Sequence, residues 1–79
     1  MQQQNDILLQ NFGKHVKQLR EKKKMSLNEF AYKSLLWTSA TQSRIENGLV
    51  DPKLSTIVKI ANAMDMSVSE LLEGFDFKF

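Results

Sequence analysis

The chain has 79 residues, a net charge of +2, a single histidine and no cysteine. At this length it forms one domain, expected over residues 1–79, with neither a disulfide framework nor a cluster of zinc ligands. Its apolar runs fall far short of the roughly 18 residues that span a membrane, and the polar residues 2–6 do not resemble a signal peptide. We therefore expect a chain that is stabilised by packing alone and stays in the cytoplasm.

Charge is unevenly distributed along the chain. Residues 14–59 carry ten of the eleven Lys and Arg residues but only four acidic residues, which gives this block a charge of +6, whereas residues 60–79 carry −3. A positive block next to an acidic end is typical of a protein that binds a polyanion on one face. On charge alone, a solvated helix end at residues 22–24 is an equally good interpretation.

The first part of the chain predicts one helix. Its apolar side chains recur at helical spacing, namely Leu8, Phe12, Val16 and Leu19. This pattern predicts a helix over about residues 6–23, with Asn5 or Asp6 as its cap and lysines at its negative end.

Two shorter helices are predicted next. Ser26 and Glu29 have the spacing of a capping box, in which each side chain bonds a free amide of the first turn. This motif predicts a second helix that ends near Ser34. Thr38 can cap a third helix of about ten residues, which Gly48 terminates.

The remaining residues predict a loop and two more helices. Residues 49–53 contain the only proline and are expected to form a loop. Apolar residues then repeat at helical spacing, namely Leu54, Ile57, Ile60, Ala61 and Met64. Ser67 and Glu70 form a second capping box, and Gly74 is expected to end the fifth helix. The chain is therefore predicted to be all-α, with a helical core over about residues 6–74.

The tail, residues 75–79, alternates phenylalanine with charged residues, which is a strand pattern in an otherwise helical chain. One interpretation is a dimer contact, because exposed phenylalanines are costly. The other is that one or two of the rings of Phe75, Phe77 and Phe79 fold back on the core while the rest frays.

The outer face of the predicted third helix carries residues that do little to stabilise the helix itself. At about 3.6 residues per turn, Ile45 lies on the core side with Thr41 and Gln42. The opposite arc consists of Ser39, Ala40, Ser43 and Asn47, flanked by Arg44. A solvated helix would normally carry Glu and Lys there. A short, polar face edged by arginine instead suits close approach to the edges of bases.

The order of several short segments is characteristic. They are Phe12-Gly13-Lys14, Leu19-Arg20, Met25-Ser26, Phe30-Ala31, Arg44-Ile45-Glu46-Asn47-Gly48, Pro52, Ile60-Ala61-Asn62-Ala63-Met64 and Val68-Ser69-Glu70-Leu71-Leu72. Together they resemble the helix-turn-helix domains of the phage-repressor-like family (Cro and Xre type) over roughly residues 11–73. The resemblance implies a compact five-helix, lambda-repressor-like fold with the helix-turn-helix at the second and third helices. It also implies a transcriptional regulator that binds double-stranded DNA as a homodimer on a pseudo-palindromic operator.

The resemblance further implies roles for individual residues. The third helix would lie in the major groove, where the positions that face bases are Ser39, Ala40, Ser43 and Arg44. Arg44 is expected to contribute most to specificity, because a guanidinium can bond O6 and N7 of one guanine. The positions that meet phosphates are Ser26, Leu27, Asn28, Thr38, Asn47 and Lys53. Arg20 and Glu46 are expected to form an ion pair that links the first helix to the end of the recognition helix.

The chain departs from the family pattern around the turn. Leu27 stands where the family often has glutamine, so only its backbone N–H can meet a phosphate. The turn before the third helix has one extra residue and lacks the usual glycine, and Gln42 stands where an apolar residue is normal. We hypothesise that Trp37 packs into the space that Gln42 does not fill, the alternative being that Trp37 stacks on the DNA.

Catalysis finds no support in the sequence. His15 has no nucleophile or acid at a useful spacing and lies beside the core face of its helix, so we expect a half-buried structural histidine. No cofactor, metal or small-molecule substrate is implied. Besides a regulator, the pattern fits a protein-interaction module of the same fold, of the antitoxin or anti-repressor type, with weak DNA specificity.

Overall fold

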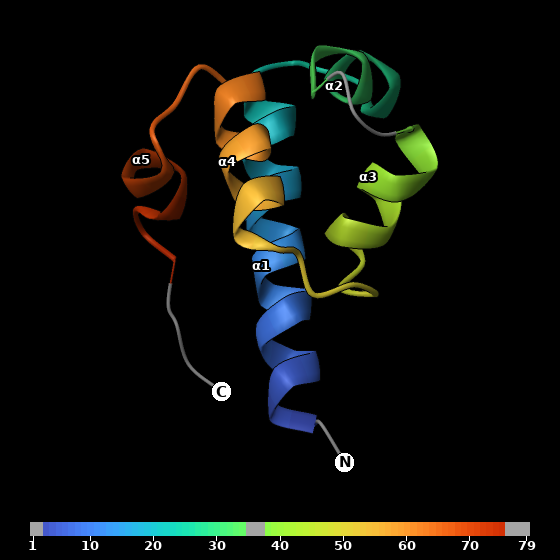
Figure 1. The fold of residues 1–79 in the computed structure, drawn as a ribbon, viewed down its shortest axis with the longest axis vertical. Coiled ribbons are helices and arrows are strands. Elements are labelled where there is room, and N and C mark those ends of the chain that lie inside the picture. Colours follow the sequence, from blue (N-terminus) through green and yellow to red (C-terminus); the bar gives the residue numbers. More distant parts are fainter. Residues whose placement is uncertain (1–2, 35–37, 76–79) are drawn as a thin grey trace.

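The computed structural model describes residues 3–34 and 38–75. It contains the helices α1 (Gln3–Lys22), α2 (Leu27–Ser34), α3 (Ser39–Glu46), α4 (Leu54–Ala63) and α5 (Val68–Leu72). No strand occurs in these two ranges, and the all-α prediction is confirmed. α1 forms the long axis of the molecule, with α4 in front of it, α5 on one side, α3 on the other and α2 across one end (Figure 1).

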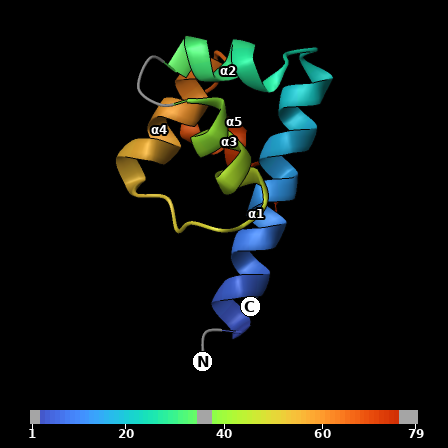
Figure 2. The same ribbon diagram turned by 90° about the vertical axis from the view of Figure 1, so that its right-hand side faces the viewer.

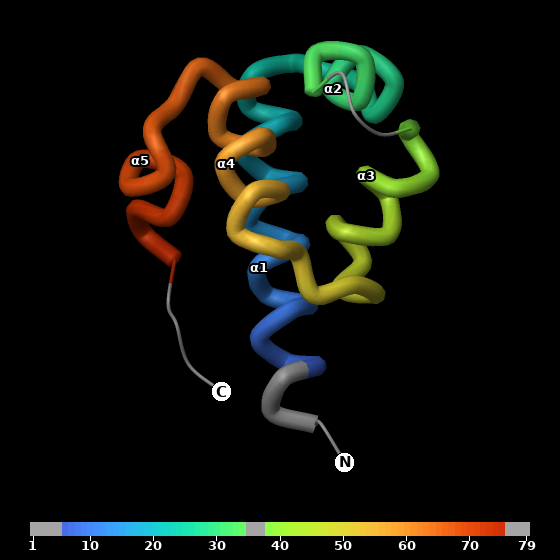
Figure 3. Tube along the Cα trace, in the orientation of Figure 1, coloured from blue at the N-terminus to red at the C-terminus, as the bar shows by residue number. Residues whose placement is uncertain are grey.

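The packing order of the helices places α3 at the edge of the molecule. α3 packs against α1 and α2, α2 also packs against α4, and α4 packs against α5. The chain leaves α5 toward the end of the molecule at which α1 begins (Figure 3). The buried core draws on every helix, through Phe12, Val16, Phe30, Ile45, Ile60, Ala61, Ala63, Met64 and Leu71.

The helix starts follow the predicted caps with one exception. Ser26 and Glu29 form the expected capping box, with the Ser26 amide donating to Glu29 Oε1 at 2.8 Å and the Glu29 amide to Ser26 Oγ at 3.1 Å. Ser67 forms the same box with Glu70, and Thr38 caps α3 by accepting from the Thr41 amide.

The exception is α1, which begins at Gln3 rather than near residue 6. Asn5 and Asp6 therefore lie within the helix, and their prediction as caps was wrong. The physical reason is that glutamine is a good helix former and neither glycine nor proline interrupts the preceding residues.

Four helix ends share one backbone feature. The second residue after the helix has a positive φ after α1, α3, α4 and α5, namely 58° at Lys24, 74° at Gly48, 56° at Asp65 and 80° at Gly74. In each case the next amide bonds a carbonyl in the last turn of the helix. Gly48 therefore terminates α3 as predicted, and α3 has eight residues rather than about ten.

Two glycines allow the end of α3 to lie directly on the backbone of α1. A Cβ built on Gly13 would lie 2.6 Å from the carbonyl oxygen of Ile45 and closer still to that of Glu46. A Cβ built on Gly48 would lie 2.8 Å from the backbone of Gln10. Neither neighbour is a flexible side chain, so a larger residue at either position would push the two segments apart.

Contacts of His15 and Phe75 link α1 to the last described residues of the chain. His15 is half-buried as expected, and its Nε2 donates to the carbonyl oxygen of Leu71 at 2.6 Å. The Phe75 ring packs edge-on against Phe12, with ring centres 5.8 Å apart. One ring of the tail thus folds back on the core, whereas the predictions for Phe77, Phe79 and Trp37 lie outside the described residues.

The close approach at Gly13 makes a prediction about stability. In an ordinary helix interior a Gly→Ala change stabilises by about 1 kcal/mol. Because the new methyl group would meet the backbone of α3, we expect Gly13→Ala to lower the free energy of unfolding by about 1–3 kcal/mol. Urea unfolding of this variant and of Lys14→Ala, a change at the exposed neighbouring position, provides the measurement and its control. A Gly13→Ala protein as stable as the wild type would contradict the close packing.

Candidate nucleic-acid interface

The outer face of α3 is accessible to a ligand. In the view of Figure 2, α3 faces the viewer below α2, beside α1 and in front of α5. Ala40 and Arg44 are exposed on this face, and Ser39 and Ser43 are half-buried at its edges. All four predicted base-contacting positions therefore have accessible side chains, and their contact with bases stays a prediction.

The inner face of α3 combines one apolar and two polar residues. Ile45 is 2% exposed and belongs to the core, whereas Gln42 and Glu46 are buried polar residues, 0% and 7% exposed. A buried polar group needs hydrogen-bond partners, because an unpaired one costs about 1–3 kcal/mol. The burial of Gln42 and Glu46 on the inner face therefore depends on their hydrogen-bond partners.

Arg20 of α1 provides the main partner. Its Nε donates to Glu46 Oε2 at 2.7 Å and its Nη2 donates to Glu46 Oε1 at 3.0 Å, so the guanidinium and the carboxylate pair through two parallel bonds. The pair is buried, with Arg20 only 6% exposed. The hydrogen bonds that Arg20 donates to Glu46 raise the pKa of Arg20 above its usual value. The guanidinium therefore stays charged at any physiological pH, and the pair holds α3 on α1.

The same guanidinium also reaches the turn between α1 and α2. Arg20 Nη1 donates to the carbonyl oxygen of Met25 at 2.6 Å. Met25 immediately precedes Ser26, the cap of α2. One side chain therefore fixes the end of α3 relative to the start of α2. By family resemblance, α3 is expected to contact bases and the start of α2 to contact phosphates.

The predicted phosphate-contacting residues lie at three helix starts and one helix end. Ser26, Leu27 and Asn28 form the start of α2, where Leu27 is half-buried and Asn28 exposed. Thr38 and Asn47 flank α3, and the side-chain amide of Asn47 donates to Ser43 Oγ at 3.3 Å. Lys53 is exposed at the start of α4. Their contact with phosphates stays a prediction.

Sequence reasoning missed Gln42 and Gly13 as parts of this site. Gln42 stands where the family normally has an apolar residue, but its Nε2 donates to Glu46 Oε2 at 2.8 Å. The spacing of four residues between Gln42 and Glu46 was the available signal, because such residues meet on one helix face. For Gly13, the signal was a glycine inside a predicted helix.

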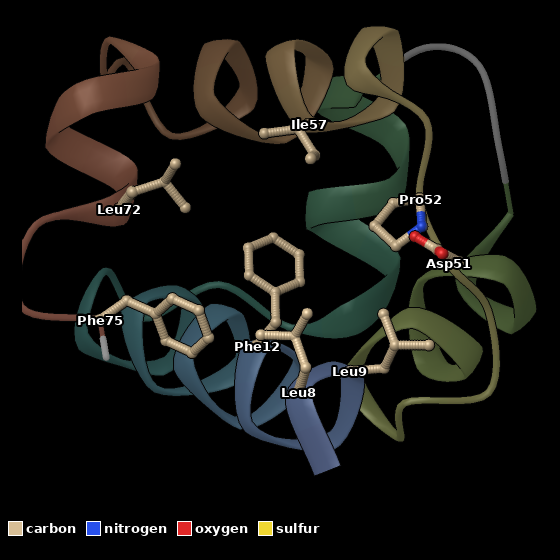
Figure 4. Close-up of a pocket in the computed structure, with 8 residues that line it drawn as sticks. All are labelled: Leu8, Leu9, Phe12, Asp51, Pro52, Ile57, Leu72 and Phe75. Carbon is tan, nitrogen blue, oxygen red and sulfur yellow. The ribbon is translucent and has the colours of Figure 1, made fainter. Parts of the chain in front are cut away.

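A separate apolar pocket lies away from α3. It encloses about 130 Å³ between α1, α4, α5 and the loop that precedes α4 (Figure 4). Its lining residues are Leu8, Leu9, Phe12, Asp51, Pro52, Ile57, Leu72 and Phe75. This lining offers apolar contact rather than paired acids, bases or nucleophiles, so it gives no basis for assigning a reaction.

Residues 3–34 and 38–75 contain neither a metal-ligand cluster nor a helix that could span a membrane. Within these ranges no three His, Cys, Asp or Glu side chains come together as metal ligands. Every helix there is too short or too polar to cross a bilayer. These ranges therefore provide no metal centre and no helical membrane span.

Comparison with known proteins agrees with this geometry. Residues 16–71 match the model of the HTH_3 helix-turn-helix family. No curated protein sequence matches the chain. The chain resembles the restriction-modification controller protein C.AhdI from Aeromonas hydrophila, with 30% identity and a TM-score of 0.78, over 84% of this chain and 94% of that one.

Two further solved structures have the same fold within longer chains. ComR from Streptococcus suis is 32% identical with a TM-score of 0.74, over 86% of this chain but 22% of ComR. A Vibrio cholerae HTH_3 family transcriptional regulator is 24% identical with a TM-score of 0.80, over 90% of this chain and 39% of that regulator. Because the family model covers more than half of the chain, the chain belongs to the HTH_3 helix-turn-helix family of DNA-binding transcriptional regulators.

Proposed function

We propose that the chain recognises a specific duplex DNA sequence through the outer face of α3. The observation that carries this proposal is the division of α3 into two faces. Gln42, Ile45 and Glu46 hold the helix from inside, while Ala40 and Arg44 remain exposed outside. A recognition helix needs both properties, because base-edge hydrogen bonds require an accessible face in a fixed position.

The charge distribution and one relative support this assignment. The block of residues 14–59 carries +6 and includes α2 and α3, which suits a polyanionic partner. The Aeromonas protein is a controller protein, and this chain covers 94% of it. A domain of this extent therefore suffices for a regulator in a related protein.

We further propose that the chain acts as a homodimer on a pseudo-palindromic operator. Two half-sites one helical turn apart are about 34 Å apart. The described domain has extents of 34 × 24 × 21 Å, so two copies side by side can present their α3 helices at this spacing. Leu49, Leu54 and Val58 expose large apolar side chains on and after the loop that follows α3, and a second copy would cover such residues.

The second candidate function is a protein-interaction module of the antitoxin or anti-repressor type. The exposed side chains of Leu49 and Leu54, 66% and 73% accessible, are the observation that favours it. A partner protein could cover them as well as a second copy of the chain. The two candidates differ in whether duplex DNA is bound with sequence preference.

Selection from a random duplex library at physiological salt tests the proposed function. We expect enrichment of a sequence with two related half-sites centred about 10 base pairs apart. Affinity for that sequence should fall with salt, with a logarithmic slope of about −0.9 per phosphate contact. A pool from which no duplex is enriched would rule out the regulator and favour the interaction module.

Arg44 should determine part of the sequence preference. We expect Arg44→Ala to reduce discrimination at one base position by about 1–3 kcal/mol, because the guanidinium can bond two guanine acceptors at once. Lys53→Ala is the matched control, since loss of a phosphate contact weakens binding to all sequences alike. Affinities for the selected duplex and its single-base variants measure both effects. A uniform loss of affinity in Arg44→Ala would instead assign Arg44 to the phosphates.

The Arg20–Glu46 pair should matter more for binding than the nearby surface lysines. Arg20→Met strands a buried carboxylate and is expected to cost about 3–5 kcal/mol of stability, with loss of DNA affinity. Lys22→Met, a change at an exposed position, should reduce affinity much less. The double variant Arg20→Met with Glu46→Leu removes the stranded charge and should regain part of the stability, less the cost of the lost Gln42–Glu46 bond, without regaining affinity. Equal affinity losses in Arg20→Met and Lys22→Met would show that the pair does not orient α3.

A further inference from the structure

We propose that Gln42 is a positioning residue for α3, which aligns the Glu46 carboxylate with Arg20 and so fixes the rotation of the helix about its own axis. This inference rests on the proposed function, in which the outer face of α3 contacts the bases. It concerns a residue that contacts no DNA itself, because the side chain of Gln42 is completely buried.

The hydrogen bonds around Glu46 carry the first step. Glu46 Oε2 accepts from Gln42 Nε2 at 2.8 Å and from Arg20 Nε at 2.7 Å, and Oε1 accepts from Arg20 Nη2 at 3.0 Å. A carboxylate has about four acceptor sites, two on each oxygen. Both sites of Oε2 are therefore used, one by α1 and one by α3 itself.

The position of Gln42 explains why this second bond matters. Gln42 lies one turn before Glu46 on the same helix, so its amide restricts the rotamers of the Glu46 side chain from within α3. Without it, Arg20 alone would hold a long, flexible side chain. The amide thus presents the carboxylate to the guanidinium in the orientation that accepts two parallel bonds.

The rotation of α3 is coupled to the outer face by simple geometry. An α-helix with its side chains has a radius of about 5–6 Å, so a rotation of about 10° moves the side-chain ends by about 1 Å. The range of good hydrogen-bond distances spans only about 0.5 Å. Ser43 and Arg44 follow Gln42 directly in α3. A small rotation would therefore misplace the residues proposed to contact bases without unfolding the domain.

The chemistry of the site separates this role from a purely structural one. Removing one partner of a buried hydrogen bond costs about 1–3 kcal/mol, and in Gln42→Met the Glu46 carboxylate keeps its two bonds to Arg20. Methionine is unbranched, of similar length and adaptable in cores, so it fills the space of the glutamine. We therefore expect this variant to remain folded, with a melting temperature lowered by about 4–8 °C for each kcal/mol lost.

Nuclear magnetic resonance tests the coupling without DNA. We expect exchange of the Arg20 Nε proton with solvent to become at least about tenfold faster in Gln42→Met, because the shared acceptor is less well oriented. Gln18→Met, the same change at an exposed position of α1, is the control and should leave this exchange unchanged. Unchanged Arg20 exchange in Gln42→Met would overturn the proposal.

Binding to the selected duplex provides the second measurement. We expect Gln42→Met to lose about tenfold of the discrimination between the preferred sequence and its single-base variants, and Gln18→Met to lose none. Full discrimination in a folded Gln42→Met protein would reduce Gln42 to a packing residue. If the wild type itself enriched no duplex, the proposed function would fail, while the exchange measurement would still decide whether Gln42 orients Glu46.

A further measurement on the wild type covers the case in which Gln42→Met does not fold. The side-chain amide protons of Gln42 should then exchange more slowly than those of the exposed Gln18 by at least about tenfold, as expected for a buried, bonded amide. Equal exchange of the two amides would overturn the proposal.

Discussion

The position of α3 depends on the buried ion pair between Arg20 and Glu46. A helix of eight residues is too short to be stable alone, and Ile45 is the only large apolar side chain that α3 buries in the core. Apolar contact is also non-directional, so it cannot by itself fix how a helix is rotated. The paired guanidinium and carboxylate are directional and desolvated, and they persist only because further hydrogen bonds compensate the cost of burial. The pair therefore specifies orientation more than it adds stability.

The two glycines set the distance over which this pair acts. Gly13 and Gly48 bring the backbones of α1 and of the end of α3 into direct contact. At that separation the side chain of Arg20 can reach Glu46 and still bond the carbonyl group of Met25. The two glycines thus set the distance between α1 and α3, and the ion pair sets the orientation of α3. Both constraints act on the same end of α3, the end whose termination at Gly48 the sequence already indicated.

Local signals predicted most of the fold, with the start of α1 as the exception. The two capping boxes, the Thr38 cap and the stop at Gly48 depend on residues close in sequence, and all four are present. The side of α3 that carries Ile45 followed from helical periodicity for the same reason. The spacing of Gln42 and Glu46 indicated that their side chains meet, but the burial of Gln42 could not be predicted, because it depends on how α1 and α2 enclose α3. The early start of α1 was missed because caps were preferred over the helix propensity of the glutamines. The proposed DNA contacts rest on the polar outer arc of α3 and on family resemblance, since an exposed serine or lysine has no local signature of its partner.

The separation of α3 into two faces has a consequence for how the family diversifies. Residues that hold the helix in place and residues available to a ligand do not overlap, since Ala40 and Arg44 are exposed while Gln42, Ile45 and Glu46 are buried. Mutations on the outer face can therefore accumulate with little effect on folding, as surface substitutions usually do. Under the proposed function, a gene duplicate of such a protein can acquire a new target by a few changes in one short helix while the scaffold is inherited intact. The same property makes this domain a suitable framework for engineered libraries in which only the outer positions of α3 are varied.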